Sequence, residues 1–152
     1  MKRYGVLSGI LLLVLFASPT TAFAAGDLSR QTPVELRVQL GDEKGVRRFF
    51  PEKLELETGK LYRVILSNPS PEMHYFSSDA LSQAVFTRKV QVNGPDGKPI
   101  AEIKGSIREI EVYPKASTEW WFVPIKTGQF TDLKCTVQGH TEAGMVGQIV
   151  VK

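Results

Sequence analysis

The chain has 152 residues, 42% hydrophobic and 23% charged, so it is long enough to bury one core but too short for two full domains. Its formal net charge of +3 includes two basic residues near the start, and the +1 that remains over residues 25–152 gives no electrostatic case for binding nucleic acid. A single cysteine, Cys135, excludes an internal disulfide.

The first 24 residues have the pattern of a secretory signal peptide. A basic start precedes an apolar run over residues 6–16, and Ala22 and Ala24 supply the small residues that signal peptidase requires. The run is short for a membrane span, and an uncleaved anchor is the competing interpretation. We therefore expect a signal peptide over residues 1–24 and one exported domain over residues 25–152, with a formal charge of +1 once the two basic residues at the start are removed.

Alternating hydrophobic and polar residues predict short strands along the rest of the chain, most clearly from Val34 to Leu40. Further strands are expected, between turns rich in Gly and Pro, over residues 54–56, 61–67, 89–92, 100–104, 107–113, 119–123 and 145–151. A short helix is expected within residues 77–86, capped by Ser77 or Ser78. Seven or eight short strands with little helix indicate an all-β antiparallel sandwich or barrel.

Three scarce residue types gather in one short segment near the end of the chain. The segment reads Cys135-Thr-Val-Gln-Gly-His140-Thr-Glu-Ala-Gly-Met145, a Cys-x4-His-x4-Met spacing between two strands. Gly139 and Gly144 allow the backbone to turn back on itself. The segment therefore predicts a tight loop from which three metal ligands converge.

The types of these ligands favour copper. A thiolate, neutral imidazoles and a thioether suit an ion that cycles between Cu(I) and Cu(II) in a trigonal His2Cys plane with a weak axial Met. The second imidazole would come from His74, the only other histidine, which follows the rigid segment over residues 68–71. The neighbouring Met73 should point the opposite way in extended backbone. Taken one at a time, Cys135 could equally be a buried structural thiol and Met145 a core residue.

The loop resembles the copper loop of the cupredoxins, the blue copper proteins. Its spacing is most similar to that of the rusticyanin and auracyanin type, whereas plastocyanin has a shorter interval between Cys and His. Residues 59–74 resemble the family's strand leading into the first histidine ligand, and residues 110–122 resemble its mid-chain strand pair. The resemblance implies an all-β, Greek-key, cupredoxin-like β-sandwich of about seven to eight strands. It also implies one type 1 copper ion, with His74, Cys135 and His140 as equatorial ligands and Met145 as the axial ligand.

By the same resemblance the protein would be an electron carrier without enzymatic activity. It would act as a monomer on transient redox protein partners in the periplasm or, in a photosynthetic cell, the thylakoid lumen. His140 would be the electron port if its ring edge reaches the surface. Nucleic acid and stable membrane insertion are not expected, unless the segment over residues 1–24 is retained as an anchor.

Three positions depart from the family pattern. Gln138 stands where many members have proline, and Tyr75 follows His74 where several have Asn or Ser. One additional residue between Gly128 and Cys135 predicts a β-bulge near residues 131–132. These departures bear on the potential and the stability of the site.

Other functions remain open from the sequence. A copper storage or delivery protein is the main alternative, although such carriers tend to use several methionines and residues 25–152 contain only Met73 and Met145. An interaction module with an empty site is a third. A Cys-His hydrolase lacks an orienting acid, and an exposed thiolate would oxidise outside the cell. The basic pairs at residues 47–48 and 88–89 could steer an acidic partner, but such pairs are usually solvated surface.

Overall fold

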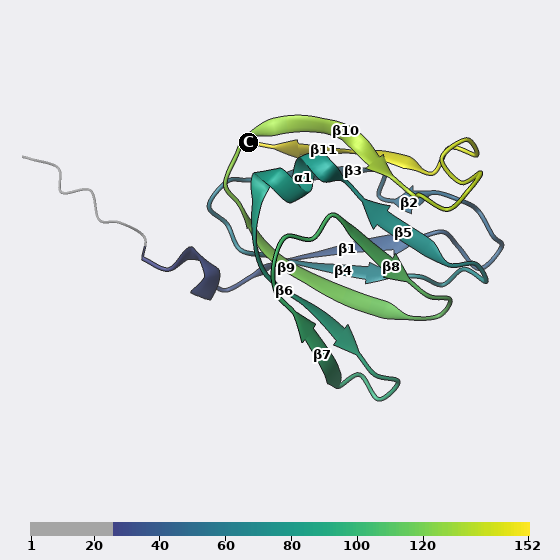
Figure 1. The fold of residues 1–152 in the computed structure, drawn as a ribbon, viewed down its shortest axis with the longest axis horizontal. Helices are drawn as coiled ribbons and strands as arrows, with labels where there is room; N and C mark the ends of the chain where they lie inside the picture. The colour runs from purple at the N-terminus through teal and green to yellow at the C-terminus, as the bar shows by residue number, and fades with distance from the viewer. Residues whose placement is uncertain (1–25) are drawn as a thin grey trace, which may run out of the picture.

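Two β-sheets pack face to face in the structure, a computed structural model that describes residues 26–152 (Figure 1). The predicted signal peptide over residues 1–24 lies outside the described residues. The elements are η1 (Leu28–Arg30), β1 (Val34–Leu40), β2 (Phe49–Phe50), β3 (Lys53–Leu56), β4 (Tyr62–Ser67), β5 (His74–Ser77), α1 (Asp79–Ala84), β6 (Val85–Asn93), β7 (Pro99–Ile103), β8 (Glu109–Val112), β9 (Ser117–Pro124), β10 (Gly128–Lys134) and β11 (Val146–Val151). Within residues 26–152, no helix has the length and hydrophobicity that crossing a membrane requires.

One sheet has the strand order β2-β1-β4-β9-β6-β7 and the other β3-β11-β10-β5-β8. Most neighbouring strands are antiparallel, but β1 pairs with β4, and β3 with β11, in parallel. Every strand predicted from alternation is present, and β10 is the strand in which the bulge was predicted. With β2 and β5 the described total is eleven instead of seven or eight. Strand β2 has two residues, too few to show a period-two pattern. Strand β5 reads His-Tyr-Phe-Ser, which does not alternate hydrophobic and polar types, and a bulge interrupts the pattern in β10.

The core between the sheets is built around a row of aromatic rings. Phe49 meets Phe76 edge-on with ring centroids 5.8 Å apart, and Phe76 meets Trp120 in the same way at 6.4 Å. Trp120 in turn packs on Phe122 at 4.7 Å. Aromatic pairs of this geometry add to the free energy gained from burying their surface. Because Phe76 lies two residues after His74 on the same strand face, this row anchors the strand that begins with His74.

The bulge predicted near residues 131–132 is confirmed by a shift in the β10–β11 register between Phe130 and Leu133. The bulge directs Asp132 toward the start of α1, where its carboxylate accepts hydrogen bonds from Ser78 Oγ at 2.7 Å and the Ala80 N–H at 2.9 Å. Ser78 is the N-cap, as predicted, and accepts from the Leu81 N–H. The helix is thereby fixed to the strand that leads into Cys135.

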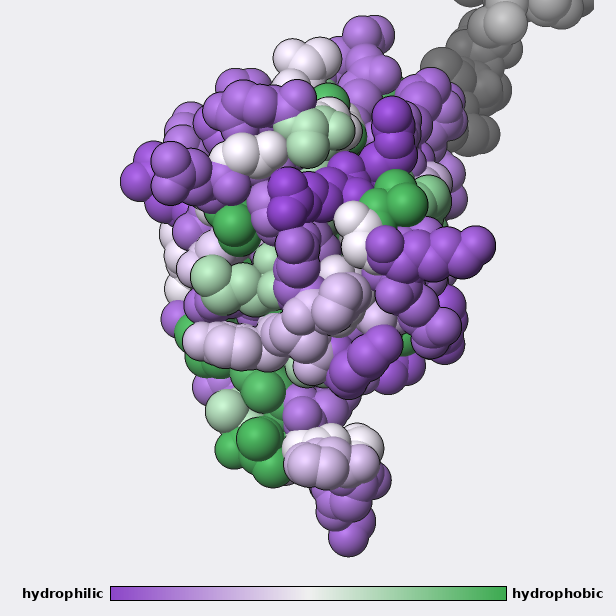
Figure 2. Space-filling view, turned by 90° about the vertical axis from the view of Figure 1, so that its right-hand side faces the viewer, coloured by the Kyte–Doolittle hydropathy of each residue, from purple (hydrophilic) through white to green (hydrophobic). Residues whose placement is uncertain are grey.

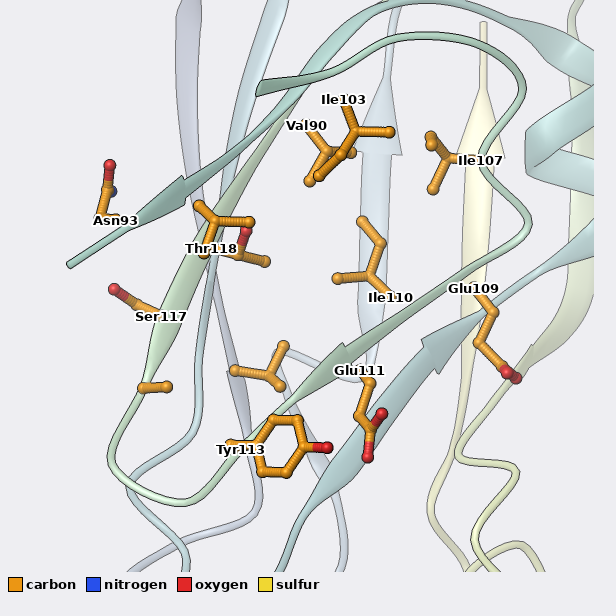
Figure 3. Close-up of a pocket in the computed structure, with 13 residues that line it drawn as sticks. Val90, Asn93, Ile103, Ile107, Glu109, Ile110, Glu111, Tyr113, Ser117 and Thr118 are labelled. Atoms are coloured by element: carbon orange, nitrogen blue, oxygen red, sulfur yellow. The ribbon is translucent and has the colours of Figure 1, made fainter. Parts of the chain in front are cut away.

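The β6–β7 hairpin leaves an open pocket against β8 and β9. All five residues of β7 are exposed, and the pocket of about 320 Å³ is lined mainly by aliphatic side chains (Figure 3). Val90, Ile103, Ile107 and Ile110 border it, with Glu109 and Glu111 on one side. This pocket does not include any of the predicted copper ligands.

Candidate metal centre

The predicted ligand loop is held in a tight fold by its own backbone. Strand β10 ends one residue before Cys135, whose N–H donates to the Met145 carbonyl at 3.1 Å, and the Met145 N–H donates to the His140 carbonyl at 2.9 Å. Gly139 and Gly144 have φ angles of 80° and 93°, in the left-handed region that glycine adopts without steric cost. The prediction that these two glycines turn the loop back on itself is confirmed.

His74 reaches the same end of the sandwich at the start of β5. Asn68, which is buried, holds the connection before it: its side-chain amide donates to the carbonyls of Glu72 and Val112, both at 2.8 Å. The loop between β10 and β11 and the connections that follow β1 and β4 all lie at the right-hand end of the molecule in Figure 1. The topology therefore brings residues 61 positions apart in the chain, His74 and Cys135, to one place.

Three candidate ligand atoms form a compact triangle at this end. The two Nδ1 atoms of His74 and His140 are 3.2 Å apart, and Cys135 Sγ is 3.8 Å and 3.4 Å from them. A point in their plane equally distant from the three atoms lies about 2.0 Å from each. This matches the roughly 2.0–2.3 Å bonds that a divalent metal such as zinc makes to imidazole nitrogen and thiolate sulfur. The three side chains fit a trigonal metal site.

The site is closed to solvent. His74 and Cys135 are fully buried, and His140 is 3% exposed. Met145 is also fully buried, and the loop hydrogen bonds fix its backbone beside Cys135 and His140. Met73 is 40% exposed, so it points away from the site as expected from alternation. Two nitrogens, one sulfur and a neighbouring buried thioether are the donor set that suits copper.

The environment keeps both imidazoles neutral and the thiol protonated in the absence of a metal. Burial, reinforced by His140, lowers the pKa of His74 to about 4. Burial and the nearby Arg47 lower the pKa of His140. Burial raises the pKa of the Cys135 thiol, although the backbone N–H groups of Tyr75 and Val137 oppose this. Neutral imidazoles are ready ligands, and a bound cation would take the place of the thiol proton.

The metal-free protein should lose stability as the pH falls from about 6.5 to about 4. Because the pKa of His74 is lowered from 6.5 to about 4 by folding, the unfolded chain binds a proton in this range that the folded chain does not. The free energy of unfolding should fall by on the order of 3 kcal/mol over this range, and urea unfolding at several pH values measures the change.

A His74→Leu variant is the control for this pH dependence, because it fills the buried position with a side chain that does not titrate. Its free energy of unfolding should change less than that of the wild type between pH 6.5 and 4.5, because only His140, whose pKa is also lowered, then contributes. Equal slopes for the two proteins in this range would mean that another group causes the effect.

The thiol sulfur also has a fixed hydrogen-bond donor. The Tyr75 N–H donates to Cys135 Sγ at 3.3 Å, a contact made by the backbone and so independent of the side chain at this position. The departure from Asn or Ser at Tyr75 therefore leaves this backbone contact in place. A donor to the sulfur stabilises its thiolate form.

Two charged residues that the sequence did not assign to the site cover its outer side. Arg47 binds both carboxylate oxygens of Glu72, at 2.8 Å and 2.9 Å, and Glu72 Oε2 is 3.5 Å from His140 Nε2. The Arg47 guanidinium holds the pKa of Glu72 below its usual range. The ring edge of His140 is thus covered by a carboxylate. The basic pair at residues 47–48 gave only a weak signal, because its acidic partner is 25 residues away in the sequence.

No protein-family model matches the sequence, and no curated protein matches it. Among solved structures, the chain is similar to a copper-containing nitrite reductase of Thermus scotoductus, with 18% identity and a TM-score of 0.59 over 82% of this chain and 32% of that one. It is similar to a multicopper oxidase of Campylobacter jejuni described as a metallo-oxidase, with 16% identity and a TM-score of 0.55 over 80% of this chain and 31% of that one. Auracyanin A, a blue copper protein of Chloroflexus aurantiacus, matches with 18% identity and a TM-score of 0.48 over 80% of this chain and 100% of that one.

The chain therefore spans about a third of the length of the nitrite reductase and the oxidase, and it shares its fold with that part of each. The predicted cupredoxin-like sandwich is confirmed as a fold.

Proposed function

We propose that this chain with the cupredoxin-like fold is an exported blue copper protein that carries single electrons. One type 1 copper ion would be held by His74, Cys135, His140 and Met145. The observation that supports this most is the convergence of two imidazole nitrogens and one thiol sulfur about a common point roughly 2.0 Å from each, in a closed site. When bound, the ion takes up and releases one electron between Cu(I) and Cu(II).

The chain contributes rigidity to this function. His74 is fixed by β5 and by the buried Asn68, and Cys135 is fixed by the end of β10 and the hydrogen bonds of the loop. Ligands held in this way need to move little when the charge of the site changes, which lowers the cost of electron exchange. The burial of all four side chains excludes competing water ligands.

The partners would be transient redox proteins in the periplasm or the thylakoid lumen, met by a monomer. We propose no enzymatic activity for the chain. The reductase and oxidase activities named for the two longer proteins belong to chains of which this one covers about a third. Copper storage or delivery without electron transfer is the alternative function.

The test is a titration of the purified chain with Cu(II), followed by visible and electron paramagnetic resonance spectra, beside a Cys135→Ser variant. We expect one equivalent to give an intense thiolate-to-copper band and a narrow copper hyperfine splitting, both absent in the variant. Reductant should bleach the band and oxidant should restore it, with copper retained.

Two outcomes would contradict the proposal. The same weak, ordinary Cu(II) spectrum in both proteins would show that Cys135 is not a ligand. Ready transfer of copper from the wild type to an acceptor chelator, without reversible bleaching, would favour storage or delivery.

A further inference from the structure

The two histidines of the site differ in what their outer nitrogens meet. His140 Nδ1 faces Cys135 and His74, while its Nε2 lies 3.5 Å from Glu72 Oε2, an ion-pair distance longer than a full hydrogen bond. His74 Nε2 is buried and has no hydrogen-bond partner among the described residues. Only His140 therefore has an acidic neighbour on the side opposite the metal position.

Glu72 is fixed in place over His140 from two directions. Its carboxylate is bound by both Nε and Nη2 of Arg47, in the paired geometry that restricts a carboxylate most strongly. Its backbone is bound at both polar groups, since its N–H donates to Ser70 Oγ at 3.0 Å and its carbonyl accepts from Asn68 Nδ2 at 2.8 Å. The side chain of Glu72 is 39% exposed, but these four hydrogen bonds restrict its position.

A carboxylate in this position selects the form of the imidazole. It attracts the ring proton to Nε2 and leaves the lone pair on Nδ1, the nitrogen that faces the metal position. In the metal-free protein the His140 Nδ1 can then accept from the His74 Nδ1–H, 3.2 Å away. This leaves a proton-free Nε2 on His74, which agrees with its buried position away from any acceptor.

We propose that Glu72, held by Arg47, positions His140 as a ligand and tunes the site toward Cu(II). The negative charge of Glu72 makes the imidazole of His140 a stronger electron-pair donor to a metal ion. A stronger electron-pair donor favours Cu(II), the more highly charged ion, over Cu(I). The tuning toward Cu(II) rests on the proposed copper function, whereas the positioning of the His140 ring does not. The end of the molecule that carries these residues is mainly hydrophilic (Figure 2), so a partner would approach His140 across the Arg47–Glu72 pair instead of a bare ring edge.

The experiment compares Glu72→Gln and Glu72→Asp with Glu52→Gln. Glu52 forms a similar exposed pair with Arg48 at 2.6 Å but its side chain does not contact the ligands, so it controls for the loss of one charge at this end. We expect Glu72→Gln to lower the preference for Cu(II) over Cu(I) about tenfold, which raises the one-electron potential by about 59 mV. Glu72→Asp keeps the charge but withdraws it from the ring, so it should give a change of the same sign. Glu52→Gln should alter the preference less than about twofold.

A second readout uses the metal-free proteins. Nitrogen NMR of the imidazoles should place the proton of His140 on Nε2 in the wild type and in Glu52→Gln, and distribute it between both nitrogens in Glu72→Gln. If Glu72→Gln has the tautomer and the potential of Glu52→Gln, the proposal is wrong. A tautomer change without a change in potential overturns the tuning.

The two proposals can fail separately. If the wild type never forms a blue, reversible copper site, the electron-carrier function and the tuning both fail. The NMR comparison then still decides whether Glu72 orients His140.

Discussion

Replacing Gly41 with alanine should destabilise the folded protein by about 2–5 kcal/mol and weaken copper binding at least tenfold. Gly41 has a φ angle of 71°, and a Cβ there would lie 2.6 Å from His74 Nε2 and 3.0 Å from the Ser70 Cβ. The imidazole has no space to retreat, because His74 is fully buried. The added methyl group would therefore push the ligand out of position. Urea unfolding and a copper titration measure the two effects.

Gly45→Ala is the matched control. Gly45 lies in the same loop with a φ angle of 81°, but a Cβ there would meet no atom within 4 Å. Alanine at this position should cost only the backbone strain, about 1–2 kcal/mol, and leave copper binding unchanged. Equal copper affinities for the two variants would show that the close approach of Gly41 to His74 does not hold the ligand in place.

The sequence predicted the part of the site that is local in the chain. Cys135, His140 and Met145 lie within eleven consecutive residues, so their spacing alone indicated one loop, and Gly139 and Gly144 indicated how it turns. The structure adds what the spacing did not predict, a hydrogen bond from the Cys135 N–H to the Met145 carbonyl and one from the Met145 N–H to the His140 carbonyl.

His74 was predicted for a weaker reason, since it is the only other histidine in the chain. Its position depends on the topology, which pairs β5 antiparallel with β10, with Ser77 opposite Lys134, so that His74 lies on the side of the residues that follow β10. The residues that hold His74 and His140 in place could not be predicted. Gly41, Arg47 and Glu72 lie on connections between strands, and their contacts join segments at least 25 residues apart.

The strand pattern was predicted well where one strand face is buried and the other is wet. In β3 the burial alternates as Leu54 and Leu56 require. The pattern fails in β9, where polar and apolar residues are buried on both faces. Glu119 is only 4% exposed although its position predicts the outer face, because neighbouring side chains cover it. A single sequence does not show which outer positions are covered in this way.

Glu119 is paired with Arg63, and replacing Arg63 with methionine should lower the free energy of unfolding by about 3–5 kcal/mol. Arg63 Nε donates to Glu119 Oε2 at 3.0 Å, and Trp121 Nε1 donates to the same oxygen at 2.9 Å. Burial alone raises the pKa of Glu119, but the hydrogen bonds from Arg63, Trp121 and Asn93 outweigh burial and leave this pKa lowered. Without the guanidinium, the folded protein would hold a buried carboxylate with no cation bound to it. Urea unfolding at neutral pH measures the loss.

Arg37→Met is the matched control, because Arg37 pairs with Glu35 on the same sheet but its side chain is 73% exposed. It should cost less than about 1 kcal/mol. If the two variants are equally stable, the Arg63–Glu119 pair contributes no more than a surface pair.

Two further measurements isolate the buried charge as the cause. A double variant, Arg63→Met with Glu119→Gln, should recover most of the lost stability, since the amide still accepts from Trp121 and no charge remains to be buried.

The pH dependence of the free energy of unfolding should also indicate the buried charge as the cause. In the wild type the lowered pKa of Glu119 stabilises the fold above the ordinary glutamate pKa, and this contribution is lost as the pH falls. In Arg63→Met the same carboxyl would have a higher pKa than in the wild type, because the arginine no longer lowers it, so the difference between the two proteins should shrink as the pH is lowered. A constant difference, or no recovery in the double variant, would assign the loss to packing of the arginine stem. The copper spectrum should be the same in all these variants, because the Arg63–Glu119 pair makes no contact with His74, Cys135 or His140.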